Sequence, residues 1–388
     1  MIRAYIDQGG LMNQVRRKRL DGIESLRAYA AVSVIMFHLA ESGGALLPGS
    51  LSFIASHFGM GVPLFFVLSG FSMAYGYFGR LSGDSIMRDY FIRRFARIAP
   101  FFYIMIAFQL GVLYFVYGIT HSPLDVLLHA TFVFNFIPHL TEGIVPASWT
   151  IGVEMVFYAL FPLFIMLCTN IWRSIAVVAL STIVATKFNV DVRPFENQIS
   201  SFLYHNFVVQ LPYFLWGILF FHIHQAVFEK VEERRHRYLC WGLIAFGLFG
   251  LLHLYNNTTL YLFFFMQGLR TTWDTLWSIP LGSFCLAMAL HPSRILSNRV
   301  TQYLGKISFS LYLVHPTVLY GFGQAGVYKW IYALVPSSLA VGYAMSFAFS
   351  LGVIAAISAV TYRLIEVPGM NWGKKMATRQ SPVAAEKV

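Results

Sequence analysis

Charged residues are scarce in this chain. Only 12% of its 388 residues are charged, about half the share found in an average soluble protein. So few charges cannot cover a water-soluble surface of this size, which excludes a cytosolic enzyme and a disordered chain. Hydrophobic residues make up 57% of the sequence. Because one membrane span needs about 20 mostly apolar residues, the composition predicts an all-α polytopic membrane protein.

Cysteines and metal-binding patterns are also scarce. The three cysteines, Cys168, Cys240 and Cys285, lie in or beside apolar runs and lack metal or redox spacing. We interpret them as packing thiols, which excludes a disulfide-stapled secreted domain. No HExxH, CxxC, Walker or dinucleotide-binding glycine motif occurs. The sequence therefore predicts no metal site and no bound cofactor.

Long apolar segments predict about ten transmembrane helices and three parts of the chain. The parts are a basic N-terminal segment at 1–22, a ten-helix transmembrane domain at 23–366 and a polar tail at 367–388. Two further segments, 124–137 and 258–269, are too short to span and predict surface or re-entrant helices. The ten predicted spans are 23–40, 60–79, 95–118, 150–168, 174–187, 203–224, 239–255, 274–291, 307–328 and 334–362.

Basic residues are distributed unevenly along these segments. If the N-terminus is cytoplasmic, all but four of the 28 Lys and Arg fall on the inner side. The four outer ones are Lys187, Arg193, Arg270 and Lys329. By the positive-inside rule, this predicts that both termini are cytoplasmic. It also explains the net charge of +11 by contact with the lipid bilayer, with no nucleic acid as a partner.

Three ionisable groups inside the predicted spans are candidates for function, because such groups are costly in a membrane. Arg27 and His38 share one helix face, about 16 Å apart along the axis, with His38 in the outer half. Glu154 follows the interfacial Trp149 and lies at a similar depth. A carboxylate beside a histidine orients a general base. The alternatives are snorkelling for Arg27, an interhelical hydrogen bond for His38, and helix capping or exposure to water for Glu154.

Arginines cluster at the inner end of the third span. Arg93 or Arg94 lies on the same face as Arg97, and guanidinium groups on one face can hold phosphates bidentately. The same residues could instead contact anionic lipid.

Two weaker candidates lie in other spans. Ser69 precedes Gly70 where small residues allow close helix packing, and Ser69 would need a nearby base to act as a nucleophile. His315 precedes Pro316, where a kink could open a polar pocket or the ring could make a core hydrogen bond.

A set of motifs in order along about residues 21–368 resembles the acyltransferase-3 family of bacterial integral-membrane O-acyltransferases. Its usual Asp-Gly-Leu-Arg opening is spread out here as DGIESLR, so Arg27 takes the arginine position. The chain resembles the stand-alone form, without an appended periplasmic domain. The motifs are ESLRAYAAVSVIMFH, FFVLSGFS, RRFARIAP, SWTIGVEMVFY, PYFLWGIL, LGKISFSLYLVHP and TYRLIEVP.

This resemblance implies transfer of an acyl group, usually acetyl, in the bacterial inner membrane. The donor would be cytoplasmic acyl-CoA, and the acceptor a hydroxyl of a glycan or lipid-linked saccharide. Catalysis would fall to His38, as general base or transient acyl carrier, with Glu154 beside it. Substrate binding would fall to the remaining candidates, Arg27, Arg93, Arg94, Arg97, Ser69 and His315.

Other functions stay open from the sequence. Intramembrane His and Glu would suit a proton-coupled transporter or flippase. An acyl translocator would pass the group to a separate glycan-modifying partner, and a structural scaffold would leave the arginines and histidine unexplained. The acceptor, the acyl group and the oligomeric state are left undetermined.

Overall fold

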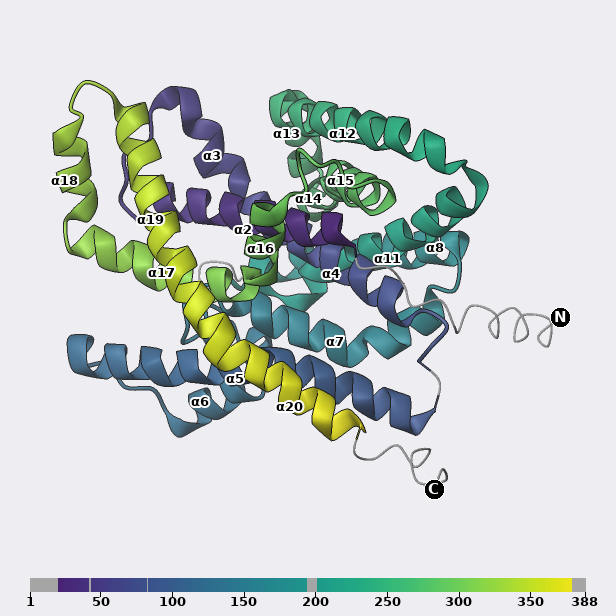
Figure 1. Cartoon of the computed structure of the whole chain (residues 1–388), viewed down its shortest axis with the longest axis horizontal. Helices are drawn as coiled ribbons and strands as arrows, with labels where there is room; N and C mark the ends of the chain where they lie inside the picture. Colours follow the sequence, from purple (N-terminus) through teal and green to yellow (C-terminus); the bar gives the residue numbers. More distant parts are fainter. Residues whose placement is uncertain (1–19, 42, 82, 194–200, 379–388) are drawn as a thin grey trace.

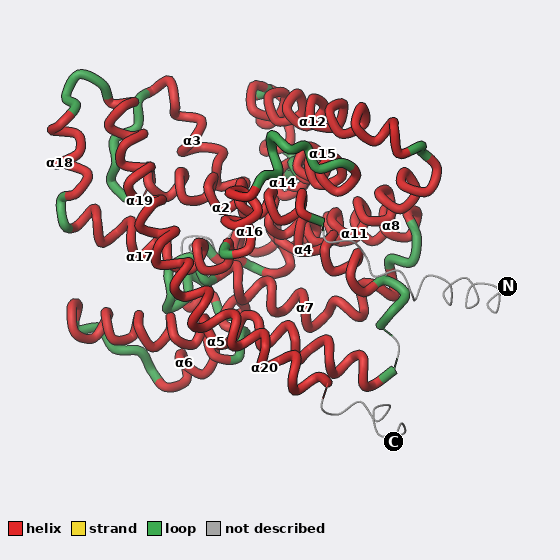
Figure 2. The backbone as a smooth tube through the Cα atoms, viewed as in Figure 1, coloured by secondary structure: helices red, strands yellow, loops and turns green. Residues whose placement is uncertain are grey.

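The computed structural model describes residues 20–41, 43–81, 83–193 and 201–378. These residues form helices joined by loops, and no strand occurs among them (Figure 2). Most of the predicted basic segment at 1–22 lies outside the described residues. The prediction of an all-α architecture is confirmed.

Eight stretches of helix in the described chain are long and apolar enough to cross a membrane, which confirms a multi-pass membrane protein (Figure 1). Which face is cytoplasmic stays a prediction. The helices in these stretches are α2 (Asp21–Glu41), α4 (Gly61–Tyr77), α5 (Asp84–Tyr117), α7 (Trp149–Leu167), α8 (Ile171–Val192), α10 (Phe202–His205) with α11 (Phe207–Lys230), α12 (Glu233–Asn256), and α19 (Leu339–Thr361) with α20 (Val367–Thr378).

The other two expected spans, 274–291 and 307–328, contain helices shorter than predicted. The first holds the end of α14 (Arg270–Leu276) and α15 (Ser278–Leu290). The second is mainly α17 (Ser308–Gln324), which follows α16 (Arg299–Lys306) after a break at Ile307. Pro280 lies in the first turn of α15, where its missing amide hydrogen costs no helical bond. Nearly every residue of α15 is buried. Its apolar sequence therefore faces protein, and 13 residues are too few to cross a bilayer unaided.

Short helices lie at the ends of the bundle, and the segments 124–137 and 258–269 are among them. In the first of these segments, His129 lies in the last turn of the helix. Its Nδ1 donates to the Asp125 carbonyl oxygen, and its Nε2 accepts from the Ile144 amide at 3.0 Å. Burial lowers the pKa of His129, which keeps Nε2 an acceptor. The short elements are η1 (Gly49–Leu51), α3 (Ser52–His57), η2 (Phe58–Met60), α6 (Pro123–Ala130), η3 (Phe134–Phe136), η4 (Pro138–Leu140), α13 (Thr258–Met266) and α18 (Val327–Leu334).

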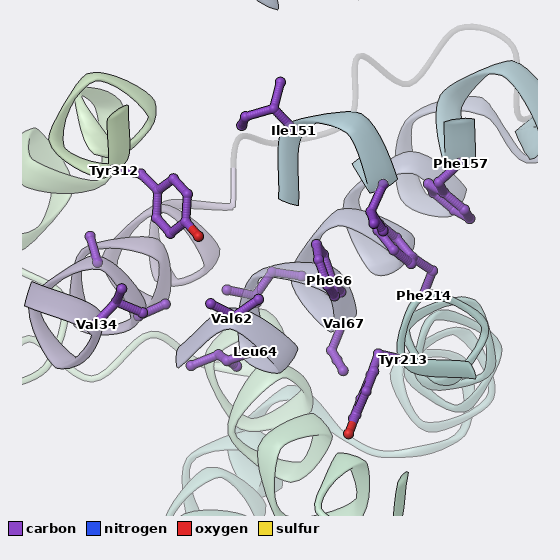
Figure 3. Packing of buried hydrophobic residues seen from close by; sticks show 14 of the residues in the cluster. Val34, Val62, Leu64, Phe66, Val67, Ile151, Phe157, Tyr213, Phe214 and Tyr312 are labelled. Carbon is purple, nitrogen blue, oxygen red and sulfur yellow. The ribbon is translucent and has the colours of Figure 1, made fainter. Parts of the chain in front are cut away.

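The core centres on α4, which packs against α2 on one side and α11 on the other. Figure 3 shows buried hydrophobic residues of this core, aliphatic and aromatic. Phe66 of α4 stacks on Phe214 of α11 with ring centroids 4.5 Å apart, and Phe157 of α7 stacks on Phe214 at 4.1 Å. Gly70 and Gly217 bring the two backbones close together, since a Cβ on either would overlap backbone atoms of the other helix. The predicted close approach at Ser69-Gly70 is therefore present.

Gly70→Ala is expected to destabilise the protein strongly, because its methyl group would overlap the Phe214 carbonyl oxygen. Overpacking of this kind costs about 1–3 kcal/mol or more. Gly76→Ala is the matched control on the same helix, since nothing lies within 4 Å of a Cβ there. It should leave stability unchanged or raise it slightly. Thermal unfolding in detergent measures both, and equal melting temperatures for the two variants would contradict the close packing.

The helix that begins as α19 continues beyond the expected transmembrane domain. A π-helical turn, η6 (Tyr362–Glu366), joins it to α20. The turn occurs where Pro368 cannot donate to the preceding turn of helix. α20 lies along α5 (Figure 1), and Gly369 and Gly373 allow the contact, because a Cβ on either would press on Ala96. Residues 367–378 of the expected polar tail are therefore a packed helix, a difference from the prediction.

Candidate active site

A central cavity of about 70 Å³ lies among α2, α4, α5, α7 and α17. Apolar side chains that include Phe65, Phe66 and Ile151 form part of its wall. A space of this size holds a few water molecules or a small acyl group. The polar residues of its lining are Arg27, Ser69, Arg97, Thr150, Glu154, Tyr158, Ser308 and Tyr312.

Glu154 lines this cavity and accepts two hydrogen bonds from neighbouring hydroxyls. Ser69 Oγ of α4 donates to Glu154 Oε1 at 2.6 Å, and the Tyr158 hydroxyl donates to the same oxygen. Tyr158 lies one turn further along α7, and Tyr90 of α5 donates to its carbonyl at 2.8 Å. Glu154 therefore ties α7 to α4. This differs from the expected partnership with His38, because the two helices turn Glu154 toward the hydroxyls of Ser69 and Tyr158.

His38 instead contacts the other candidate histidine. His38 Nδ1 of α2 lies 3.0 Å from His315 Nε2 of α17. His315 is fully buried, and its Nδ1 is 2.6 Å from the Tyr312 carbonyl oxygen. The Tyr312 ring lines the central cavity and lies 5.4 Å from the His315 ring, centroid to centroid. The imidazole pair therefore stands next to the cavity, behind Tyr312. His38 itself lines neither this cavity nor the one described next.

A larger cavity of about 320 Å³ adjoins the first and contains the arginines. It lies between the beginning of α2, the end of α4 and the beginning of α5, the helix ends predicted to face the cytoplasm. Arg94 lines this cavity, as do Glu24 and Ser72. The two cavities share part of their walls: Arg27, Ser69, Arg97 and Tyr158 line both.

Aromatic and hydroxyl groups contact two of these arginines, Arg94 and Arg27. The Arg94 guanidinium donates to the Tyr77 hydroxyl at 3.2 Å and lies over the rings of Tyr77 and Tyr158, at 5.4 and 5.7 Å. Arg27 donates to Ser72 Oγ at 3.3 Å. Within the described chain, no carboxylate lies within ion-pairing distance of Arg27, Arg94 or Arg97. The larger cavity is therefore cationic and suited to an anionic ligand.

Arg93 does not belong to this group. Its side chain is exposed, and it lines neither cavity. The helical spacing allowed either Arg93 or Arg94 to share a helix face with Arg97. In the structure, Arg94 lines the larger cavity together with Arg97. Among the described residues, no three His, Cys, Asp or Glu side chains gather in a way that could hold a metal.

Glu366 is a buried acid near the site, and the sequence analysis predicted no role for it. It lies in the π-helical turn, accepts from Ser310 Oγ, and interacts electrostatically with Arg97. Thr361 donates to the same serine at 2.9 Å. A signal for it was available, since Glu366 closes a long apolar segment, where an acid is costly. Tyr158 and Tyr312 were also missed, because tyrosine is common in apolar segments of this chain.

Glu154→Ala is expected to lower the free energy of unfolding by about 1–3 kcal/mol, because the buried hydroxyls of Ser69 and Tyr158 lose their acceptor. Glu154→Gln keeps an acceptor oxygen, so its loss should be clearly smaller. Chemical or thermal unfolding of the purified variants measures the difference. If both variants lose the same stability, the hydrogen bonds are not what Glu154 contributes.

The sequence profile of the acyltransferase-3 family, described as an acyltransferase domain, matches residues 20–363. The chain belongs to this family. No curated protein and no solved structure matches it. The match spans both cavities and the histidine pair. The protein is therefore an acyltransferase embedded in a membrane by many helices. The buried polar groups described above are the candidates for its acyl-transfer site.

Proposed function

We propose that this acyltransferase takes an acyl group, acetyl in the first instance, from cytoplasmic acyl-CoA and transfers it to a hydroxyl of a glycan or lipid-linked saccharide. The bacterial inner membrane is the proposed location. One observation carries the proposal: a cationic cavity shares two of its arginines with an adjacent small central cavity, which lies beside a histidine pair. This is the layout required to bind an anionic donor at one end and to react at the other.

The donor half of the proposal rests on the arginines. Coenzyme A carries a pyrophosphate and a 3′-phosphate, and arginine binds phosphate oxygens in pairs. Arg94 is already oriented by Tyr77 and Tyr158, so little side-chain entropy is lost on binding. The thioester, at the end of the long pantetheine arm, would reach past Ser69 into the central cavity. Arg27 and Arg97, which line both cavities, would accompany it.

The acceptor half rests on His38. As a residue His38 is partly exposed, whereas its partner His315 is fully buried, so of the two histidines only His38 can be approached by a hydroxyl. As a general base, His38 would remove the hydroxyl proton while the oxygen attacks the thioester carbonyl, a contribution of about 10²–10⁴ in rate. Coenzyme A would leave as the thiolate and take up a proton.

Purified protein in sealed vesicles, given acyl-labelled acetyl-CoA on one side, tests the proposal. Glycans extracted from cells that lack the protein serve as acceptors, and the His38→Gln variant serves as the control. We expect label in the glycan, with free coenzyme A released in equal amount. Label that crosses the membrane without entering glycan would indicate an acyl translocator that needs a partner. If a solute crosses the vesicle membrane while the thioester of acetyl-CoA stays intact, the protein would be a transporter.

A further inference from the structure

Ser69 of α4 stands where the two cavities share a wall, because it lines both of them. A serine hydroxyl is a weak nucleophile until a base within hydrogen-bond reach takes its proton. Such a base is present, since Ser69 Oγ donates to Glu154 Oε1 at 2.6 Å. Ser69 is 4% exposed, so its hydroxyl is shielded from bulk water and lies beside a space that can hold a small acyl group.

The carboxylate of Glu154 is itself oriented by a third group. The Tyr158 hydroxyl donates to the same Oε1, and it also lies 3.0 Å from Ser69 Oγ. Tyr90 donates to the Tyr158 carbonyl oxygen at 2.8 Å, which ties this turn of α7 to α5. A nucleophile that is hydrogen-bonded to a base, with the base oriented by a third side chain, is the arrangement of enzymes that form covalent intermediates.

The two candidate bases stand at different places. Glu154 lines the central cavity, whereas His38 lines neither cavity and contacts His315. A thioester that enters from the arginine cavity therefore meets Ser69 and Glu154, and His38 is not part of that wall. Two separate bases suit a transfer in two steps, in which each step has a base of its own.

We infer that Ser69 is the transient carrier of the acyl group, with Glu154 as the base of the first step. The inference rests on the proposed function and divides its transfer into two half-reactions. In the first, Glu154 takes the hydroxyl proton while Ser69 Oγ bonds to the thioester carbonyl carbon. The carbon–sulfur bond breaks, coenzyme A leaves as the thiolate, and Ser69 carries the acyl group as an ester.

The second half-reaction passes the group to the acceptor. His38 removes the proton of the acceptor hydroxyl, whose oxygen attacks the carbonyl carbon of the Ser69 ester instead of the thioester. The bond to Oγ breaks, and Oγ recovers the proton held by Glu154, which ends as a carboxylate. His38 then releases its proton, which balances the one that the thiolate takes up. Arg27 and Arg97 line the cavity, so the oxyanion of the first step forms near two positive charges.

Incubation with acetyl-labelled acetyl-CoA and no acceptor tests the carrier directly. His38→Gln is the trapping variant, because it lacks the base of the second step and the ester should accumulate. We expect stoichiometric label in this variant, assigned to Ser69 by mass spectrometry of its peptides, and no label when Ser69→Ala is added. A His38→Gln protein that binds acetyl-CoA but stays unlabelled, or that carries the label at another residue, overturns the inference.

Two further substitutions in the trapping variant test the nucleophile and the base separately. Ser69→Cys should take up the acyl group as a thioester, which neutral hydroxylamine cleaves readily, whereas the ester on Ser69 resists it. Glu154→Gln keeps a hydrogen-bond acceptor but cannot take a proton, so labelling of Ser69 should slow by about 10²–10⁴-fold. Label that resists hydroxylamine in Ser69→Cys, or an unchanged labelling rate in Glu154→Gln, contradicts the inference.

Ser283→Ala is the matched structural control. It removes the hydroxyl of another buried serine, which is 2% exposed and donates to the Pro280 carbonyl oxygen at 2.7 Å on α15. Labelling of Ser69 should be unchanged in this variant, and thermal unfolding shows whether it and the Ser69 variants are folded. A loss of label in folded Ser283→Ala equal to that in Ser69→Ala would contradict a specific role for Ser69.

Exchange of labelled free coenzyme A into acetyl-CoA separates this inference from the proposed function. An acyl group on Ser69 can return to free coenzyme A, so the wild type should exchange without any acceptor, whereas Ser69→Ala should not. Exchange with no acylation of glycan would support the carrier and contradict the proposed acceptor. Acylation of glycan by a protein that neither exchanges nor retains label would support direct transfer and overturn the carrier.

Discussion

Replacing His38 by glutamine is expected to lower kcat for acyl transfer by about 10²–10⁴-fold, the usual contribution of a general base. Binding of acetyl-CoA should stay within about twofold of wild type, since His38 lines neither the arginine cavity nor the central one. Glutamine is the informative replacement, because its amide can still hydrogen-bond His315 and so preserves the buried neighbour. Steady-state transfer and equilibrium donor binding, measured on the same preparation, separate the two effects.

His253→Gln is a suitable control, because His253 is an exposed histidine on α12. It should transfer at the wild-type rate. A His38→Gln protein that is correctly inserted and acylates at near-normal rate would show that His38 is neither base nor carrier. The two roles differ in a third measurement, the incubation of wild-type protein with labelled acetyl-CoA and no acceptor. A carrier would retain label covalently on His38, whereas a base would retain none.

The sequence alone predicted most of the fold, because the relevant signals are local. An apolar run of about 20 residues identifies a membrane helix wherever it packs. The sequence also identified the polar groups that are costly in a membrane. In the structure, four of them line one cavity: Arg27, Ser69, Arg97 and Glu154. The break at Trp277, inside the expected span 274–291, was missed. Hydropathy cannot distinguish lipid from a protein interior, and α15 is buried in the interior.

Partners across helices could not be predicted, because they depend on how each helix is rotated about its own axis. Depth along the membrane normal suggested that His38 and Glu154 would meet, but Glu154 lines the central cavity and His38 does not. The rotation of each helix about its axis gives these residues other partners. Glu154 of α7 meets Ser69 of α4, and His315 of α17 meets His38. The pairing of His38 with His315 joins residues 277 positions apart. No local pattern in a single sequence encodes such a contact.

Arg94→Ala is expected to weaken acetyl-CoA binding by about 10–100-fold, as the loss of a charge-assisted contact of about 1.5–3 kcal/mol implies. Arg94 lines the larger cavity and is held over two tyrosine rings, so its guanidinium is oriented before the donor arrives. Arg94→Lys should recover little of this affinity, because an ammonium group neither stacks on the rings nor presents paired donors.

Arg93→Ala provides a stringent control, because it removes the same charge from the adjacent position on α5. Arg93 is exposed and lines neither cavity, so its loss should change donor affinity by less than about twofold, as exposed charges usually do. Equilibrium binding of labelled acetyl-CoA to both proteins in detergent, at two salt concentrations, measures the contrast. Equal losses in the two variants would mean that the arginines attract the donor only through their general positive field. A loss confined to Arg94→Ala would mean that the geometry of the cavity selects the phosphates, and would establish the arginine end of the bundle as the donor entrance.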